Sequence, residues 1–281
     1  MMASTRAELL RLLKWPTTWV MAGIWLVMNF FFAYLLTYLS YRSAVSDGQA
    51  RVAAGLLADM SPASLPPTLV QGMPMFGGAI VLILSALATG SGYGWGTWKT
   101  VLIQGPGRLS AFAGTLVALA VIVVGLVLAT LALDVASSLA VMAAEGQAFD
   151  APTGTSLAEG VGAALLIMSV FALGGALLGV VARGPALSVG LGLVWVLVVE
   201  NLLRGVAGLL SPLKAVTDVL PGTAAGSLAG AMGASGVTGP DANGTPGVLS
   251  TLTGDTAAAL LLVYGLAFVL VLGTVVRRRD A

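Results

Sequence analysis

The sequence predicts an all-α polytopic membrane protein with six transmembrane helices. Of its 281 residues, 58% are hydrophobic and only 9% are charged, and the mean hydropathy is +0.98. A soluble domain usually carries about 25% charged residues, so this chain needs lipid as part of its solvent. Crossing roughly 30 Å of hydrocarbon takes about 20 apolar residues, and charge-free runs of that order recur along the chain.

These runs divide a single transmembrane domain, residues 1–281, into six spans. The first is not a cleavable signal peptide, because its apolar run is too long and no small-residue cleavage site follows closely. The predicted spans are 18–39, 73–90, 109–133, 160–182, 185–203 and 257–276.

The segment before the first span predicts an amphipathic helix that lies in the membrane interface. Thr5 and Glu8 have the spacing of a capping box, which would open the helix. Leu9, Leu12 and Leu13 fall on one face, as in helices that rest on a membrane surface. A basic patch that only sets orientation is the simpler alternative, but it does not explain the cap.

The fifth span is short, because only 16 residues separate Arg183 from Glu200, about 24 Å of helix. It lengthens if Glu200 and Arg204 remain helical, since they are spaced i,i+4 with the acid first, the better orientation for a pair. The simpler interpretation is an ion pair at the membrane edge. The alternative is a charge that faces a transport pathway.

The segment 222–240, between spans five and six, is also uncharged. It is rich in Gly, Ala and Ser and has few large apolar groups to favour insertion. We interpret it as a re-entrant or interfacial segment on the outer side, because irregular backbone in a membrane needs protein around it.

Six spans place both termini on one side of the membrane. That side holds nine of the 13 basic residues, whereas the other side holds ten of the 12 acids. The positive-inside rule therefore makes the side of the termini cytoplasmic. A seven-span arrangement would export the basic C-terminus, 277–279, which the same rule disfavours.

Composition excludes several chemistries. The chain has no Cys and no His, so it lacks thiolate metal sites, the commonest general base and the commonest metal ligand. It has no P-loop sequence to hold a triphosphate. A net charge of +1 gives no support for a nucleic-acid partner. We therefore expect no catalytic residue, metal or cofactor on this chain.

The placement of the acids disfavours a secondary carrier. Asp134, Glu159, Glu200 and Asp255 are expected at span ends, so the membrane interior would hold almost no acid. A carrier coupled to protons or sodium usually keeps an ionisable group near the midplane. Asn29 and unwound backbone could still bind an ion.

The cytoplasmic loop 91–108 predicts a short helix. Trp95, Trp98 and Leu102 recur at i, i+3 and i+7, on one helical face, and a Gly-Pro-Gly sequence ends the helix before Arg108. The pattern favours equally a docking element for a partner and an aromatic helix that lies on the membrane.

In this layout the chain resembles the membrane subunit of ABC-2-type transporters, especially small bacterial permeases with a separate ATPase. The most specific match is the run from Tyr93 to Leu102, followed by the sequence Gly105-Pro106-Gly107-Arg108. Family members often have an acid, an aromatic residue, Gly-Thr, a helical stretch and a closing Arg; the acid is Gly92 here. The resemblance implies that the ATPase-coupling residues are Tyr93, Trp95, Gly96, Thr97, Trp98, Lys99, Leu102 and Arg108.

The resemblance also implies an ATP-driven exporter of the bacterial cytoplasmic membrane with both termini in the cytoplasm. Two permease subunits, identical or different, would face two cytoplasmic ABC ATPase subunits, and ATP and Mg²⁺ would bind to the ATPase. The sequence selects no substrate. The main alternative is a non-transporting membrane scaffold or accessory subunit; a secondary carrier and a membrane enzyme are the others.

Overall fold

The computed structural model describes residues 2–94, 96, 100, 103, 107–207, 211–234 and 245–278, and within these ranges the regular elements are all helical. In the first half of the chain the elements are α1 (Met2–Lys14), α2 (Pro16–Phe30), η1 (Phe31–Leu35), α3 (Leu36–Ser46), α4 (Ala50–Asp59), η2 (Pro62–Ser64), α5 (Leu65–Gln71), η3 (Met73–Gly77), α6 (Gly78–Gly94) and α8 (Arg108–Ala144). In the second half they are α9 (Gly154–Ala182), α10 (Pro185–Leu193), η4 (Val194–Val199), α11 (Glu200–Ala207), α12 (Ser211–Asp218), α13 (Pro221–Ala231) and α14 (Gly254–Arg278).

Six continuous helical stretches are long and apolar enough to cross a membrane, as the sequence predicted. Several of them are built from consecutive elements, and they extend beyond the predicted spans at one or both ends. The stretches are Pro16–Ser46, Pro62–Gly94, Arg108–Ala144, Gly154–Ala182, Pro185–Ala207 and Gly254–Arg278.

The centre of the bundle is the contact between α6 and α9. A Cβ atom added to Gly175 would overlap the backbone of Leu82, and one added to Gly179 would overlap Thr89. Small residues are therefore required here for the two backbones to come together, which is how helices associate in lipid, where packing replaces the hydrophobic effect.

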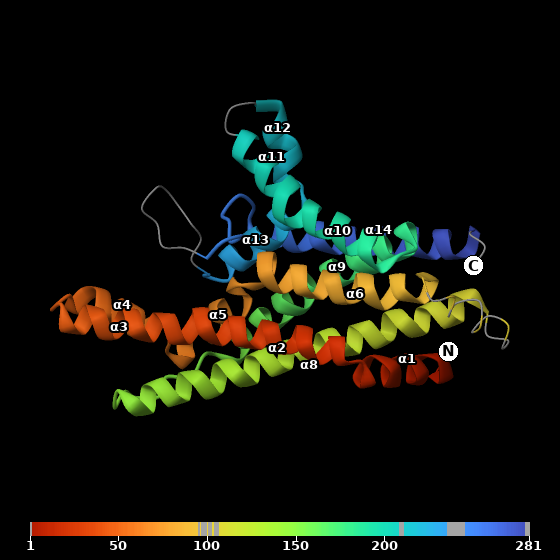
Figure 1. The fold of residues 1–281 in the computed structure, drawn as a ribbon. Helices are drawn as coiled ribbons and strands as arrows, with labels where there is room; N and C mark the ends of the chain where they lie inside the picture. The colour runs from red at the N-terminus through yellow and green to blue at the C-terminus, as the bar shows by residue number, and fades with distance from the viewer. Residues whose placement is uncertain are drawn as a thin grey trace.

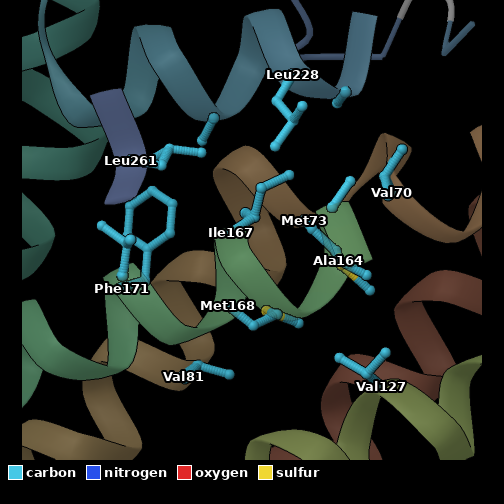
Figure 2. Close-up of a cluster of buried hydrophobic side chains, with 14 of the residues drawn as sticks. Val70, Met73, Val81, Val127, Ala164, Ile167, Met168, Phe171, Leu228 and Leu261 are labelled. Atoms are coloured by element: carbon cyan, nitrogen blue, oxygen red, sulfur yellow. The ribbon is translucent and has the colours of Figure 1, made fainter. Parts of the chain in front are cut away.

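The main hydrophobic core surrounds the middle of α9. In Figure 2, Ile167, Met168 and Phe171 of α9 lie among side chains from other helices, including Val81 of α6 and Leu261 of α14. Each of these residues is at most 4% exposed. Three helices that are distant in sequence, α6, α9 and α14, thus bury apolar side chains against one another.

The outer helices present apolar faces to the surroundings. On α14, the exposed fractions reach 65% at Leu266 and 69% at Leu270, and on α2 the figure is 66% at Val27. Contiguous apolar surface of this kind is costly in water and is characteristic of membrane-facing surfaces.

Both chain termini lie at the same end of the bundle. Figure 1 shows the N and C labels together, close to the point where α6 ends and α8 begins. We call this end the termini end and the opposite one, where α3 and α4 lie, the distal end. The arrangement agrees with an even number of spans.

The N-terminal helix forms as predicted, but its start differs. It begins at Met2, so Thr5 lies inside the helix and does not cap it, and Glu8 instead pairs with Arg11 at 2.8 Å. Leu12 is fully buried, whereas Leu13 is 40% exposed. The helix packs lengthwise on the first turns of α8, where a Cβ on Gly114 would come within 2.9 Å of Ser4. Its position at a membrane interface stays a prediction.

Residues 222–231 of the Gly-, Ala- and Ser-rich segment after the fifth span belong to the short buried helix α13. Its small residues admit the backbone that follows: the amide of Leu249 donates to the carbonyl of Gly226 at 3.0 Å. The Leu252 amide donates to the Ser227 hydroxyl at 3.2 Å. The lack of large side chains, which disfavoured a seventh span, therefore lets the backbone at Leu249 and Leu252 pack closely against α13. Re-entry of this segment into the membrane stays a prediction.

A polar cluster ties α3 to the end of α8 at the distal end. Tyr38 and Tyr41 donate hydrogen bonds of 2.7 and 2.8 Å to the two carboxylate oxygens of Glu145, and Arg42 lies 3.8 Å away. The hydrogen bonds from Tyr38 and Tyr41 are the main causes that hold the pKa of Glu145 below its ordinary value.

The Gly226 contact predicts a position-dependent effect of adding one methyl group. Gly226→Ala places a Cβ against the carbonyl of Gly247, so we expect a loss of about 1–3 kcal/mol in stability. Gly273→Ala meets no atom within 4 Å and should be neutral or stabilising by up to about 1 kcal/mol. Thermal unfolding in detergent measures both, and equal effects would contradict the described packing.

The Glu145 cluster predicts a loss of stability in acid. Because the pKa of Glu145 is lower in the folded state, its contribution is present above the ordinary Glu pKa of about 4.3 and is lost as the pH falls through the folded value. We therefore expect Glu145→Gln to flatten the fall in melting temperature between about pH 5 and pH 3. The Tyr38→Phe, Tyr41→Phe double variant should flatten it too; an unchanged profile would exclude the cluster as the cause.

Candidate functional site

The residues predicted to couple to an ATPase are only partly described by the structure. Tyr93, Gly96 and Arg108 fall within the described residues. The other five predicted coupling residues lie outside the described residues; they are Trp95, Thr97, Trp98, Lys99 and Leu102. The predicted coupling helix therefore stays a prediction.

Tyr93, near the end of α6, lies against the tight turn between α9 and α10. The guanidinium carbon of Arg183 is 6.0 Å from the centre of the Tyr93 ring, within the range of a cation–π contact. Arg183 has a left-handed backbone (φ 53°), uncommon for a residue with a side chain, and it ends α9. The turn that connects two spans is thus held beside the start of the 91–108 segment.

The other end of that segment is anchored as well. Gly107 is extended and Arg108 begins α8, whose first turns pack against α1. Arg11 of α1 donates a 3.0 Å hydrogen bond to the carbonyl of Ala88 in α6. The helix α1 therefore bridges the two spans that the 91–108 segment joins.

A second hydrophobic cluster, which we call the termini-end cluster, joins these elements. Tyr93 packs against it, and it receives side chains from α1, α6, α8, α9 and α14. Its buried members are Leu12, Ala88, Phe112, Ala118, Leu119, Ala176, Val180, Leu272 and Val276. Tyr93, near the start of the 91–108 segment, thus adjoins a cluster that four spanning helices and α1 share.

Away from the termini end, two buried hydrogen bonds connect the first and third spans. Trp25 donates to the Thr130 hydroxyl at 2.9 Å, and four residues further along each helix Asn29 donates to Asp134 at 2.6 Å. Asp134 is 0% exposed, and its second carboxylate oxygen has no hydrogen-bond partner. The equal spacing shows that these two helices run parallel.

Asp134 is buried between helices, which the sequence did not predict, while its expected position at the end of a span stays a prediction. The helix continues past it to Ala144, so the carboxylate is inside the bundle. A search for charge-free runs cannot reveal the burial of Asp134, because the search takes every charged residue as the end of a span. The available signal was the matching four-residue spacing of Trp25 with Asn29 and of Thr130 with Asp134.

Three π-helical turns in different spans lie next to one another. The rings of Phe32 in η1 and Phe76 in η3 are parallel, with centroids 6.5 Å apart. The neighbouring Met75 of η3 and Val196 of η4 line the same small pocket. Single π-helical turns are rare within α-helices and are frequent at functional sites. No local sequence pattern indicates these π-helical turns.

The pocket also contains the two charged residues of the fifth span. It lies between η3, α11 and α13, and its walls are formed by Pro74, Met75, Val196, Glu200, Arg204, Gly222 and Gly247. In Figure 1 the fifth span leaves the bundle at this level, and α11 and α12 extend sideways from it.

The predicted ion pair between Glu200 and Arg204 does not form in the described structure. Glu200, 1% exposed, accepts a 2.9 Å hydrogen bond from Trp195, and Arg204 donates one of 2.8 Å to Asn201. The two charged side chains line the same pocket without a salt bridge between them, so the predicted direct pair is wrong, while their position at the membrane edge stays a prediction. Among the described residues, no group of three acidic residues is placed to hold a metal ion.

The six apolar helices and the lipid-facing surfaces define a multi-pass membrane protein. No family model matches the sequence, and comparison with curated proteins gives no match.

The Asn29–Asp134 pair predicts a non-additive response to mutation. Asn29→Leu leaves the buried carboxyl without its donor, so we expect a loss of about 1–3 kcal/mol or more. The double variant with Asp134→Leu should be more stable than Asn29→Leu alone, because no unpaired acid remains. Unfolding of all four proteins in detergent measures the coupling, and simple additivity would contradict it.

Proposed function

We propose that this chain is the permease subunit of an ABC-2-type exporter, driven by a separate cytoplasmic ATPase. The observation that supports this most is the termini-end cluster, which connects both ends of the 91–108 segment to α1, α9 and α14. A segment that only joined two spans would not need such anchoring. A segment that receives force from a partner would need this anchoring, because the force must reach the whole bundle.

The proposed transmission runs along α6. Its last turn carries Tyr93, beside the Arg183 turn, and its first residue follows directly on η3, which lines the pocket that contains Glu200 and Arg204. The helix packs on α9 without a gap for intervening side chains, so α6 and α9 would move as one unit. The π-helical turns at its far end would absorb the displacement, because their hydrogen bonding differs from that of the flanking α-helices.

The remaining parts of the proposal follow from this arrangement. The basic termini end would face the cytoplasm, and Trp95 and Trp98 would contact the ATPase, which holds ATP and Mg²⁺. A second permease subunit would complete the pathway, and the exposed apolar faces would contact it or lipid. The buried helix α13 would be the re-entrant element on the outer side.

The proposal predicts a specific, separable loss of partner binding. The Trp95→Ala, Trp98→Ala double variant should insert and fold normally but bind its ATPase about tenfold or more weakly, because buried tryptophans dominate interfaces. Affinity purification in mild detergent from the native host measures the bound ATPase, and reconstituted vesicles measure ATP-dependent export.

The matched control is Trp19→Ala, since Trp19 is a 63% exposed tryptophan on the apolar face of α2. It should leave ATPase binding unchanged. Purification without any ATPase, under conditions that preserve other membrane complexes, would contradict the proposal and favour an accessory subunit.

A further inference from the structure

The side chain of Asp134 is enclosed by atoms of this chain alone. It is 0% exposed, so neither lipid nor a second subunit reaches it. Its Oδ1 accepts the 2.6 Å hydrogen bond from Asn29, while Oδ2 is buried without a hydrogen-bond partner. Among the described residues, Asn29 is the one hydrogen-bond donor to this carboxyl. An ionised carboxylate accepts hydrogen bonds at both oxygens, so the site leaves an ionised Asp134 half satisfied.

The turns of α8 on either side of Asp134 are covered as well. One turn earlier, the ring of Trp25, which is 1% exposed, reaches across from α2 to the hydroxyl of Thr130. One turn later, Ser138 donates a 2.8 Å hydrogen bond to the carbonyl of Met60, and both residues are fully buried. The packed bundle therefore keeps water away from the carboxyl.

The π-helical turn η1 begins two residues after Asn29 and adds a third side chain to the site. In a regular α-helix, the residue five positions after Asn29 would lie about 140° away around the helix axis. The wider π-helical turn brings Tyr34 back toward the same side. Tyr34 is 3% exposed, and the charge of Asp134 acts on it. The first span thus departs from regular helix directly beside this carboxyl.

No described ion pair includes Asp134. The next charged residue on α8 is Glu145, about 17 Å further along the helix. Arg42 of α3 lies 3.8 Å from Glu145 and interacts with that acid. The other described pairs are within α1 and within α12. The two helices that enclose Asp134 therefore supply no counter-charge to it.

The neighbouring elements do not supply a counter-charge either. The titratable side chain that η1 brings to the site is Tyr34, which is neutral. The helix α4 ends at the acid Asp59, and its Arg51 is exposed and about 12 Å back along that helix. The helix α9 carries the exposed acid Glu159 near its start. A carboxylate that is buried without a counter-charge takes up a proton and becomes neutral.

A neutral Asp134 also solves the hydrogen-bonding problem at Oδ2. As a carboxylic acid, the side chain accepts at one oxygen and donates from the other, so Oδ2 needs one acceptor. Short polar side chains in helices reach the backbone carbonyl four residues earlier. Thr130 does so in the same helix, since its hydroxyl donates to the carbonyl of Leu126 at 2.8 Å.

We propose that Asp134 is a proton-binding site, which holds its proton while α2 and η1 pack on α8 and loses it when these two spans separate. Separation admits water, the O–H bond at Oδ2 breaks, and the proton passes to a water molecule, which leaves a carboxylate on Asp134. Asn29 keeps the carboxyl in place in the packed state. This inference goes beyond the proposed transport function and does not depend on it, because it concerns the purified chain alone.

Infrared spectroscopy tests whether Asp134 carries a proton. A protonated carboxyl has a carbonyl band above the amide region, and nanodiscs of ether-linked lipids add no ester carbonyl there. At neutral pH we expect this band in the wild-type protein and its complete loss in Asp134→Asn, which keeps the shape of the side chain. The matched control is Glu159→Gln, which removes an exposed acid and should leave the band unchanged.

Transfer to D₂O tests whether the packing of the two spans retains the proton. The band shifts when deuterium replaces the proton, so the rate of the shift reports the opening of the site. Trp25→Phe removes the hydrogen bond to Thr130 beside the site and should speed the exchange about fivefold. Trp19→Phe changes a 63% exposed tryptophan on the same helix and should not alter the rate. The amide II band of the same spectra shows whether the backbone stays folded.

Three outcomes would overturn the proposal. The same spectrum in the wild-type protein and in Asp134→Asn would mean that Asp134 is ionised. A band that appears only after sodium is replaced by choline would make the site a sodium site. Equal exchange rates in the wild-type protein and in Trp25→Phe would mean that the contact between α2 and α8 does not control release of the proton.

Discussion

The close approach of α6 to α9 determines where the other helices can lie. Gly175 and Gly179 let the two backbones touch, and a single Cβ at either position would separate them. Once the pair is formed, α9 presents Ile167 and Phe171 to helices on its remaining sides. In lipid, where helices gain nothing by withdrawing apolar surface from water, this contact supplies the packing on which the rest of the bundle is built.

The polar groups inside the bundle divide into two kinds. Trp25, Thr130 and Asn29 are paired across two parallel helices and thereby fix their register. Glu200 instead accepts a hydrogen bond from Trp195, and Arg204 donates one to Asn201, so each charge is held by a neighbour on its own helical stretch. Buried polar atoms in native structures are nearly always satisfied, and these local hydrogen bonds meet part of that requirement.

The sequence predicted the six helical spans because each span must be apolar over about 20 consecutive residues, and such long runs are easy to recognise. Six charge-free runs correspond to six apolar helical stretches among the described residues. Individual charges were harder to place. The burial of Asp134 was not predicted, because Asn29, 105 residues earlier in the sequence, supplies the hydrogen bond that allows it.

The same reason explains why the pocket was not predicted. Its walls come from η3, α11 and α13, and only the i,i+4 spacing of Glu200 and Arg204 was visible locally. That spacing suggested a direct pair, because nothing in the neighbouring sequence shows that Gly222 occupies the space beside the carboxylate. Thr5 was likewise read as a helix cap from its local spacing, while contacts of α1 with α8 extend the helix to Met2.

The length of α8 has a mechanical consequence. Its 37 residues span about 55 Å, whereas the hydrocarbon layer is about 30 Å thick, so α8 would project well beyond the hydrocarbon if it stood upright in the membrane. The Glu145 cluster attaches α3 to that projecting part. The attached helices therefore form the long arm of a lever, and a tilt of about 10° at the termini end would move the tip of α8 by roughly 10 Å.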